Sequence, residues 1–363
     1  MEITIRGEGG SASRIAFGPI SGLGADLDPD KAVLVTDAEI RRLHGASFPS
    51  CPVALVERGE AAKSLSSLEA LFGRFLELGL GRDSTVVAIG GGSVSDLAGF
   101  AAFTWLRGVD FGFAPTTLLA MVDASVGGKN GVDFRGVKNL VGIFRQPRFV
   151  RMDLSLLSTL SDMEFASGMA EVVKHAVIAG GDYFELVAEE AVKSASSARR
   201  PGLDALGRIV AGSVEIKAGV VARDEREAGE RRKLNLGHSV GHGIEAATGL
   251  PHGHSVAAGL GTACRLALRM GRLSGADCGR ITRLLDACGL PSSIAAAAKA
   301  TLAAGPRALA DGPELRSAIS AAIITDKKRV GSDILMALPA AIGSVAIDAI
   351  PLSELQAFVM EAP

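Results

Sequence analysis

The sequence predicts an α/β fold in which a Rossmann-like N-terminal domain, residues 1–160, precedes an all-helical domain, residues 161–363. Two observations support this division. In the first half, short segments that are apolar throughout alternate with segments that have helical patterning, which is typical of a parallel sheet covered on both faces. From Ser161 onward only helical patterns follow one another.

The first half can be taken in order. Residues 2–18 alternate polar and apolar side chains around a Gly-Gly break, as a β-hairpin does. The segments with the length and apolar character of buried strands are 31–36, 53–56 and 85–89. The segments with helical patterning are 62–78 and 94–105.

The second half opens on a helix start signal. Ser161 and Glu164 form a capping box, in which each side chain satisfies a backbone N–H of the first helical turn, and the helix should run to about Ile178. The alanine-rich stretch 294–304 is explained by its high helix propensity. The other expected helices are 203–223, 236–248, 255–273 and 276–288.

Composition narrows the class of protein. A chain of 363 residues that is 48% hydrophobic can form two packed domains. The formal net charge is −2 and the basic residues are scattered, so we expect no nucleic-acid surface and no membrane-binding helix. The opening residues lack the apolar core of a signal peptide, and the four cysteines form no CxxC pair. These features favour a cytoplasmic protein with reduced thiols.

A glycine-rich turn follows the strand at 85–89. Gly90, Gly91, Gly92 and Ser93 lead directly into the next helix, which carries Asp96 in its first turns. Glycine lets the backbone approach a phosphate, and a helix N-terminus offers free N–H groups and a positive dipole end. The turn is therefore a candidate pyrophosphate site, although a tight strand-to-helix turn requires glycine for its own sake.

A long polar loop, residues 114–139, is interrupted by glycines and lies after a strand-like segment. A loop of this length is usually functional, and this one can present cations to a phosphate or carboxylate. The alternative is a solvated surface loop. Its polar candidates are Thr116, Thr117, Asp123, Lys129, Lys138 and Asn139.

Glu171, Lys174 and His175 share one face of the apolar helix that follows the capping box. Charged groups are costly to bury in such a helix unless they face a ligand or a metal. Glu171 is therefore a candidate metal ligand, and Lys174 should face the same cavity. The alternative is a salt bridge in water.

Four of the six histidines lie between residues 234 and 254: His238, His242, His252 and His254. His238 and His242 are four apart, so in a helix both imidazoles project from one face. Imidazole is the commonest ligand for zinc-like ions, and a carboxylate would complete a catalytic set. The alternative is that some of these histidines are ordinary polar helix residues.

Basic residues flank the histidine cluster in the chain. Lys217, Arg231 and Asn235 precede it, and Lys327 and Lys328 lie far downstream. In a chain with a net charge near zero, such cations can bind an anionic substrate.

These motifs together resemble the 3-dehydroquinate synthase family, in the same order over nearly the entire chain: GGGSVSDLAGF, LRG, PTTLLAMVDASVGGKNGVDFRGVKN, GMAEVVKH, DEREAG, LNLGHSVGHGIE, HG and DKK. The resemblance implies an NAD-binding domain, a metal-binding domain, an active site in the cleft between them, and a homodimer. It also implies conversion of 3-deoxy-D-arabino-heptulosonate 7-phosphate to 3-dehydroquinate and phosphate. The reaction would proceed by transient NAD oxidation, phosphate β-elimination, re-reduction and an intramolecular aldol step.

The resemblance also implies roles for residues at matching positions. Glu171, His238 and His252 would bind zinc or cobalt, whereas His242 would face the substrate. The positions matching NAD contacts are Asp37, Glu60, Lys63, Gly91, Gly92, Ser93, Asp96, Thr116, Thr117 and Lys138. The positions matching the substrate pocket are Asp123, Lys129, Asn139, Lys174, Lys217, Arg231, Asn235, one of Lys327 and Lys328, and Arg107, which would reach into the neighbouring subunit's site.

The chain departs from the family pattern at His254, where glutamate is usual, and at Asn130 and Asp133. Related sugar-phosphate cyclases use the same scaffold on sedoheptulose 7-phosphate or glucose 6-phosphate, but Arg231 with Lys217 favours a substrate that carries a carboxylate. A metal-dependent polyol dehydrogenase would share the two-domain plan, but Glu171 and the lysines argue against it. An inactive NAD-binding relative is disfavoured by the complete sets of candidate metal ligands and cations.

Overall fold

The computed structural model describes residues 2–6, 12–25, 27–197, 199–304, 310–324 and 329–362. The chain forms two compact units. The first comprises Met1–Ser161 and Lys217–Arg226, and the second comprises Asp162–Ile216 and Glu227–Pro363. Helix α6 (Leu203–Arg223) therefore contributes residues to both units.

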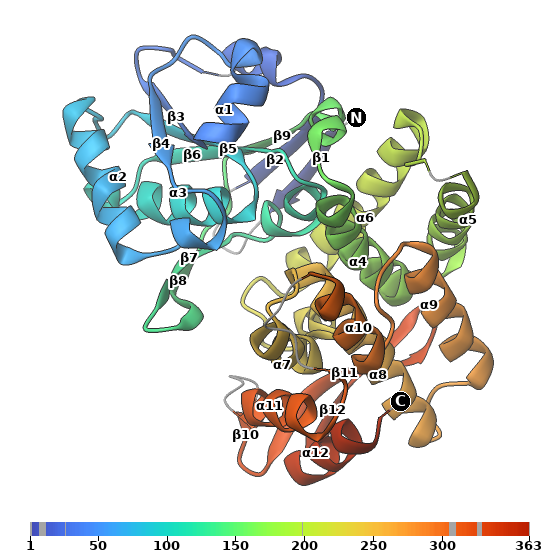
Figure 1. The fold of residues 1–363 in the computed structure, drawn as a ribbon. Helices are drawn as coiled ribbons and strands as arrows, with labels where there is room; N and C mark the ends of the chain where they lie inside the picture. Colours follow the sequence, from blue (N-terminus) through green and yellow to red (C-terminus); the bar gives the residue numbers. More distant parts are fainter. Residues whose placement is uncertain are drawn as a thin grey trace. The chain divides into compact units, whose positions relative to one another are not determined.

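The first unit is built on a seven-stranded sheet with the strand order β1-β2-β9-β6-β5-β3-β4 (Figure 1). Strands β1 and β2 pair antiparallel, which confirms the predicted hairpin, and every other neighbouring pair is parallel. The three predicted apolar strands are confirmed as β3, β4 and β5. The strands are β1 (Glu2–Arg6), β2 (Ala12–Phe17), β3 (Ala32–Asp37), β4 (Val53–Val56), β5 (Thr85–Gly90), β6 (Asp110–Pro115) and β9 (Phe149–Met152).

Helices surround this sheet in the first unit. The predicted helices at 62–78 and 94–105 are confirmed as α2 (Leu65–Glu77) and α3 (Gly92–Thr104), and α1 (Ala38–His44) follows β3. The loop predicted at 114–139 is in part a β-hairpin, which corrects that prediction: β7 (Lys129–Phe134) lies within it and pairs with β8 (Val137–Phe144), which begins in it. Short helical turns complete the unit: η1 (Ile20–Ala25), η2 (Gly45–Ser47), η3 (Gly59–Ala62), η4 (Trp105–Arg107), η5 (Ala120–Ala124) and η6 (Leu154–Thr159).

The second unit is mainly helical, as predicted. Helix α8 is its centre, because it contacts α4, α7, α9 and α10 and most of its residues are buried. Besides α6 and the short η7 (Glu230–Asn235), its helices are α4 (Asp162–Ala179), α5 (Gly181–Ser197), α7 (His238–Thr248), α8 (His252–Arg269), α9 (Gly275–Ala287), α10 (Ile294–Ala304), α11 (Pro313–Ile324) and α12 (Leu352–Glu361).

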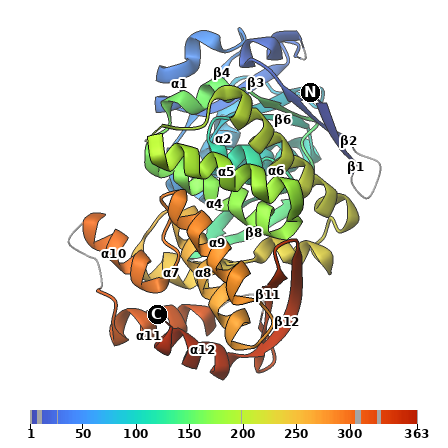
Figure 2. The ribbon, with the colours of Figure 1, turned by 90° about the vertical axis from the view of Figure 1, so that its right-hand side faces the viewer.

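The second unit is not entirely helical, which corrects the prediction for residues 161–363. A three-stranded antiparallel sheet contains β10 (Arg329–Val330), β11 (Asp333–Ala341) and β12 (Ser344–Pro351), and Figure 2 shows β11 and β12 as a long hairpin. Alanine favours helix, so the composition of this stretch concealed the strands. The hairpin turn is fixed by a long-range contact, because Gly343 N–H donates to the carbonyl of Val177 in α4 at 2.8 Å.

Helices α7 and α8 touch through glycines. A Cβ atom on Gly259 would lie 2.1 Å from the carbonyl oxygen of Gly237 and 2.6 Å from the amide nitrogen of Gly241. All three positions therefore pack backbone against backbone, which a larger residue would prevent.

In the part of the chain that the structure describes, no helix is long and apolar enough to span a membrane.

We expect Gly259→Ala to destabilise the second unit by about 1–3 kcal/mol, because the added methyl group overlaps backbone atoms that cannot rotate away. Gly275→Ala is the matched control, since a Cβ there meets nothing within 4 Å and the change should stay within about 1 kcal/mol. Thermal unfolding of the two variants measures the difference. Equal midpoints would show that the α7–α8 contact is not as tight as described.

Candidate functional site

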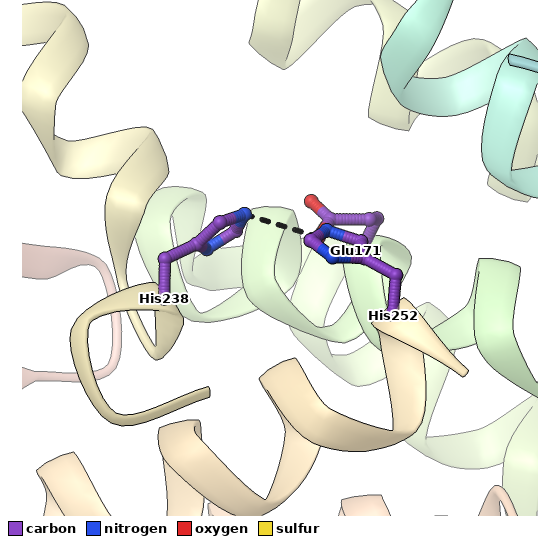
Figure 3. Close-up of side chains that lie close together, drawn as sticks. All are labelled: Glu171, His238 and His252. Atoms are coloured by element: carbon purple, nitrogen blue, oxygen red, sulfur yellow. Dashed lines mark ion pairs between the residues drawn. The ribbon is translucent and has the colours of Figure 1, made fainter. Parts of the chain in front are cut away.

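Three helices of the second unit bring Glu171, His238 and His252 together (Figure 3). His238 Nε2 lies 3.8 Å from Glu171 Oε1, and His252 Nε2 lies 4.0 Å from the same oxygen. One ligand atom from each residue lies within 4.8 Å of the others. Zinc bonds to imidazole nitrogen and carboxylate oxygen are about 2.0–2.2 Å long, so one ion can bridge atoms at these separations after small adjustments.

Helix contacts determine this convergence. His238 and His252 are the first residues of α7 and α8, the two helices that touch through glycines. Gly253 N–H donates to Ser167 Oγ of α4 at 3.0 Å, and a Cβ on Gly253 would lie 2.0 Å from the Ser167 carbonyl oxygen. Ser167 precedes Glu171 by four residues, one turn of α4, so this contact places His252 beside Glu171.

The residues fit a divalent ion. Glu171 is fully buried, and its Oε1 has no hydrogen-bond donor within the described ranges. Its Oε2 forms an ion pair with the buried ammonium group of Lys174, whereas Oε1 faces the two imidazoles. The alternative of a solvated Glu171–Lys174 salt bridge is therefore wrong. A buried carboxylate beside two imidazole nitrogens is the donor set that zinc and similar ions prefer.

The second ring nitrogens of the two imidazoles also have acceptors. His238 Nδ1 lies 3.3 Å from the carbonyl oxygen of Leu236, and His252 Nδ1 lies 3.0 Å from Glu245 Oε2. A carbonyl or carboxylate oxygen accepts a hydrogen bond, so each Nδ1 carries the proton. Each Nε2 then keeps a lone pair on the side of Glu171, as a metal ligand requires.

His242 and His254 occupy different environments. The ring centroids of His238 and His242 are 5.3 Å apart, which confirms that the pair shares a helix face, and His242 is exposed. His242, Glu245 and His252 form a second group that could hold an ion. His254 is buried; burial lowers the pKa of its imidazole, and its Nδ1 has no hydrogen-bond partner among the described residues.

Two further predicted substrate residues of the second unit, Arg231 and Asn235, lie in its described part. Arg231 is 2% exposed and lies in η7, as does Asn235. The Asn235 amide donates to the carboxylate of Glu227, a residue that the sequence alone did not single out although it lies in the DEREAG motif. Lys327 and Lys328 lie outside the described residues.

In the first unit, the glycine-rich turn lies between β5 and α3. Gly91 is the N-terminal capping position of α3 and has no side chain to occupy the free N–H groups. Thr116 N–H donates to the carbonyl of Gly90 at 2.9 Å, and a Cβ on Gly91 would lie 3.3 Å from Thr117 Cγ2. Because β5 and β6 are parallel, their carboxyl ends bring both threonines to the turn.

Polar residues from η3 and α3 meet beside this turn. Lys63 Nζ lies 2.7 Å from Asp96 Oδ2, and Ser93 Oγ donates to Glu60 Oε1 at 3.4 Å. Burial raises the pKa of the Asp96 carboxyl to about 6, against the opposing effect of the Lys63 ammonium group. Four of the predicted NAD residues therefore form two contacts, one between Lys63 and Asp96 and one between Ser93 and Glu60.

Other predicted NAD residues are placed differently. Asp37 Oδ1 caps helix α1 by accepting hydrogen bonds from the backbone N–H groups of Glu39 and Ile40 at 2.9 Å. Lys138 is exposed on β8.

Among the predicted substrate residues of the first unit, two are in contact although 94 residues separate them. Lys217 Nζ lies 2.6 Å from the carbonyl oxygen and 2.5 Å from Oδ1 of Asp123. Lys129 and Asn139 are exposed on the β7–β8 hairpin. Arg107 is exposed next to Gly108, at a positive φ of 70°.

Comparison with known proteins identifies the family. Residues 53–167 match the 3-dehydroquinate synthase N-terminal domain and residues 168–306 match the C-terminal domain. A curated 3-dehydroquinate synthase from Rippkaea orientalis is 37% identical over 361 residues, which cover 95% of this chain and 94% of that protein. The chain belongs to the 3-dehydroquinate synthase family.

Solved structures share the fold of this family member. A 2-deoxy-scyllo-inosose synthase, complexed with carbaglucose-6-phosphate, NAD+ and Co2+, is 25% identical with a TM-score of 0.83, covering 99% of this chain and 100% of that one. The 2-epi-5-epi-valiolone synthase from Streptomyces hygroscopicus subsp. jinggangensis, with NAD+ and Zn2+ bound, is 24% identical with a TM-score of 0.81, covering 96% and 95%.

The ligand set predicts different outcomes for the two histidines of α7. We expect His238→Ala to lose bound Zn2+ and, with it, activity. The loss of metal affinity should exceed the roughly 10–100-fold that is typical of residues that only support a ligand. His242→Ala should keep the ion and lower turnover, on the order of 10²-fold if the imidazole transfers a proton. Metal content after dialysis, measured by atomic emission, distinguishes the variants. Equal loss of metal in both variants would show that the proposed ligand assignment is wrong.

Proposed function

We propose that this chain converts 3-deoxy-D-arabino-heptulosonate 7-phosphate to 3-dehydroquinate and phosphate, as a phosphate-eliminating lyase of the shikimate route to aromatic amino acids. The observation that carries the proposal is the near-full-length similarity to a curated 3-dehydroquinate synthase. The convergence of Glu171, His238 and His252 in one cluster supports it independently.

Glu171, His238 and His252 would hold a divalent ion, zinc or cobalt. Such an ion supplies a Lewis acid that polarises a substrate hydroxyl. The chain itself prepares this position. Lys174 neutralises one carboxylate oxygen of Glu171, while the acceptors at both Nδ1 atoms favour the tautomer that has its lone pair on Nε2.

The glycine-rich turn and its neighbours would bind NAD. The open N-terminus of α3 suits the pyrophosphate, and Thr116 and Thr117 lie beside it. When bound there, NAD would supply reversible hydride transfer, and a complete turnover would leave no net NADH. The Lys63–Asp96 pair would bind and orient the cofactor from the adjacent helix.

Two buried basic side chains of this chain, Lys217 and Arg231, would bind the anionic groups of the substrate. Lys217 is buried and held by Asp123, which fixes its ammonium group in one position. Arg231 is buried in the other unit, and a guanidinium group binds a carboxylate through two parallel hydrogen bonds. These cations favour a substrate with both a carboxylate and a phosphate over sedoheptulose 7-phosphate or a simple polyol.

We also propose a cytoplasmic homodimer. All four cysteines are free thiols in the structure, which suits a reducing compartment. Arg107 lies on an exposed turn, where it could serve a neighbouring subunit.

Assays with a panel of candidate sugar phosphates test which substrate the protein uses. Purified protein with the heptulosonate phosphate, catalytic NAD and Zn2+ or Co2+ should release phosphate without net NADH, and a chelator should stop the release. A colorimetric phosphate assay combined with absorbance of NADH measures both products. Net NADH, or turnover only with sedoheptulose 7-phosphate, would reject the proposal.

The buried Asp96 predicts a pH dependence of NAD affinity. An acid whose pKa is raised to about 6 takes up a proton as the pH falls through that value, and it then loses its ionic contact with Lys63. We expect the Kd for NAD to be constant at higher pH and to rise by up to about tenfold per pH unit below about 6. Asp96→Asn should bind NAD weakly at all pH values and lack this step.

Titration calorimetry over a pH series measures these affinities. Asp30→Asn is the matched control, because Asp30 is exposed and lies in the same unit. A step near pH 6 that persists in Asp96→Asn would assign the titration to another group.

A further inference from the structure

Glu245 lies in α7 and has no role in the function proposed so far. Its Oε2 lies 3.0 Å from His252 Nδ1, and its side chain is 13% exposed. His252 is the first residue of α8, so the contact joins two helices across the turn that contains Pro251. A contact between a carboxylate and the outer nitrogen of a candidate metal ligand suggests a specific task.

The two candidate histidine ligands are held in different ways. His238 Nδ1 faces a backbone carbonyl, that of Leu236, which lies only two residues away. The His252 side chain is 32% exposed, whereas that of His238 is 11% exposed. The His252 ring is therefore less confined by packing, and the side chain of Glu245 provides its orientation.

The contact also selects the tautomer of His252. A carboxylate accepts hydrogen bonds, so Nδ1 carries the proton and donates it toward Glu245. Nε2 then has the lone pair, and it lies 4.0 Å from Glu171 Oε1. The opposite tautomer would place a proton where the ion belongs.

We propose that Glu245 is a positioning residue of the metal centre, which fixes the ring orientation and the Nδ1–H tautomer of His252 through its carboxylate. This inference rests on the proposed metal role of Glu171, His238 and His252. It predicts that removing the carboxylate weakens metal binding although Glu245 does not touch the ion. A hydrogen-bonded carboxylate also strengthens the imidazole as a metal ligand.

A different role for Glu245 makes a different prediction. Glu245, His242 and His252 could themselves surround an ion. In that arrangement Glu245 is a ligand, and the chain would hold a second ion beside the first or in its place. The separation of 3.0 Å between Glu245 Oε2 and His252 Nδ1 is a hydrogen-bond distance and favours positioning.

The experiment compares Glu245→Gln, Glu245→Ala and Glu354→Gln in the full chain. Glutamine keeps the size and an acceptor oxygen but removes the charge, so it tests the carboxylate even if the alanine variant folds poorly. Glu354→Gln is the matched control, since Glu354 is exposed on α12 of the same unit. Competition with a chromophoric chelator gives the Kd for Zn2+, and the visible spectrum of the Co2+ form reports its coordination.

We expect one ion per chain, a Kd for Zn2+ raised by about 10–100-fold in Glu245→Ala and by less in Glu245→Gln, and no change in the control. The Co2+ spectrum should shift in both Glu245 variants. Wild-type affinity and an unchanged spectrum would overturn the proposal. A fall from two ions to one in Glu245→Ala would overturn it by making Glu245 a ligand.

A further variant separates this inference from the proposed function. If His238→Ala also binds Zn2+ with wild-type affinity, the assigned ligand set is wrong and the positioning role is rejected with it. If His238→Ala loses the ion while both Glu245 variants keep it, only the positioning role is rejected.

Discussion

The second unit depends on the burial of one carboxylate. Glu171 is fully enclosed in α4, where an unpaired charge would cost several kcal/mol, on the order given by desolvation of ions in proteins. Lys174, one turn further along the helix, compensates one oxygen, and the imidazoles of His238 and His252 face the other. A cation bound at that oxygen would remove the remaining cost. The same interaction therefore links the stability of the unit to its metal site.

Close helix contacts make this arrangement possible. The approach of α7 to α8 at Gly259 and of α8 to α4 at Gly253 leaves no room for a Cβ atom. Because both histidines are the first residues of their helices, a small shift of either helix would move an imidazole away from Glu171. The glycines of the histidine-rich segment thus matter for ligand geometry as much as for packing.

Local patterns predicted much of this protein. The parallel strands, most of the helices and the shared face of Glu171 and Lys174 in α4 follow from apolar periodicity and helical spacing, which depend on neighbours in the chain. The β11–β12 hairpin was missed because its alanines favour helix, while its turn is fixed by a contact with Val177. The contact of Lys217 with Asp123 joins positions far apart in the chain, so spacing alone could not predict it.

The histidines show what sequence spacing cannot predict. Spacing places His238 and His242 on one helix face, but a shared face does not determine which nitrogen is free to bind an ion. That depends on what accepts the other nitrogen's proton: a carbonyl beside His238, and the Glu245 carboxylate beside His252. Both acceptors direct Nε2 toward the carboxylate of a third helix. The metal centre is therefore defined by contacts between helices, and the outer hydrogen bonds specify its ligands as much as the histidines themselves do.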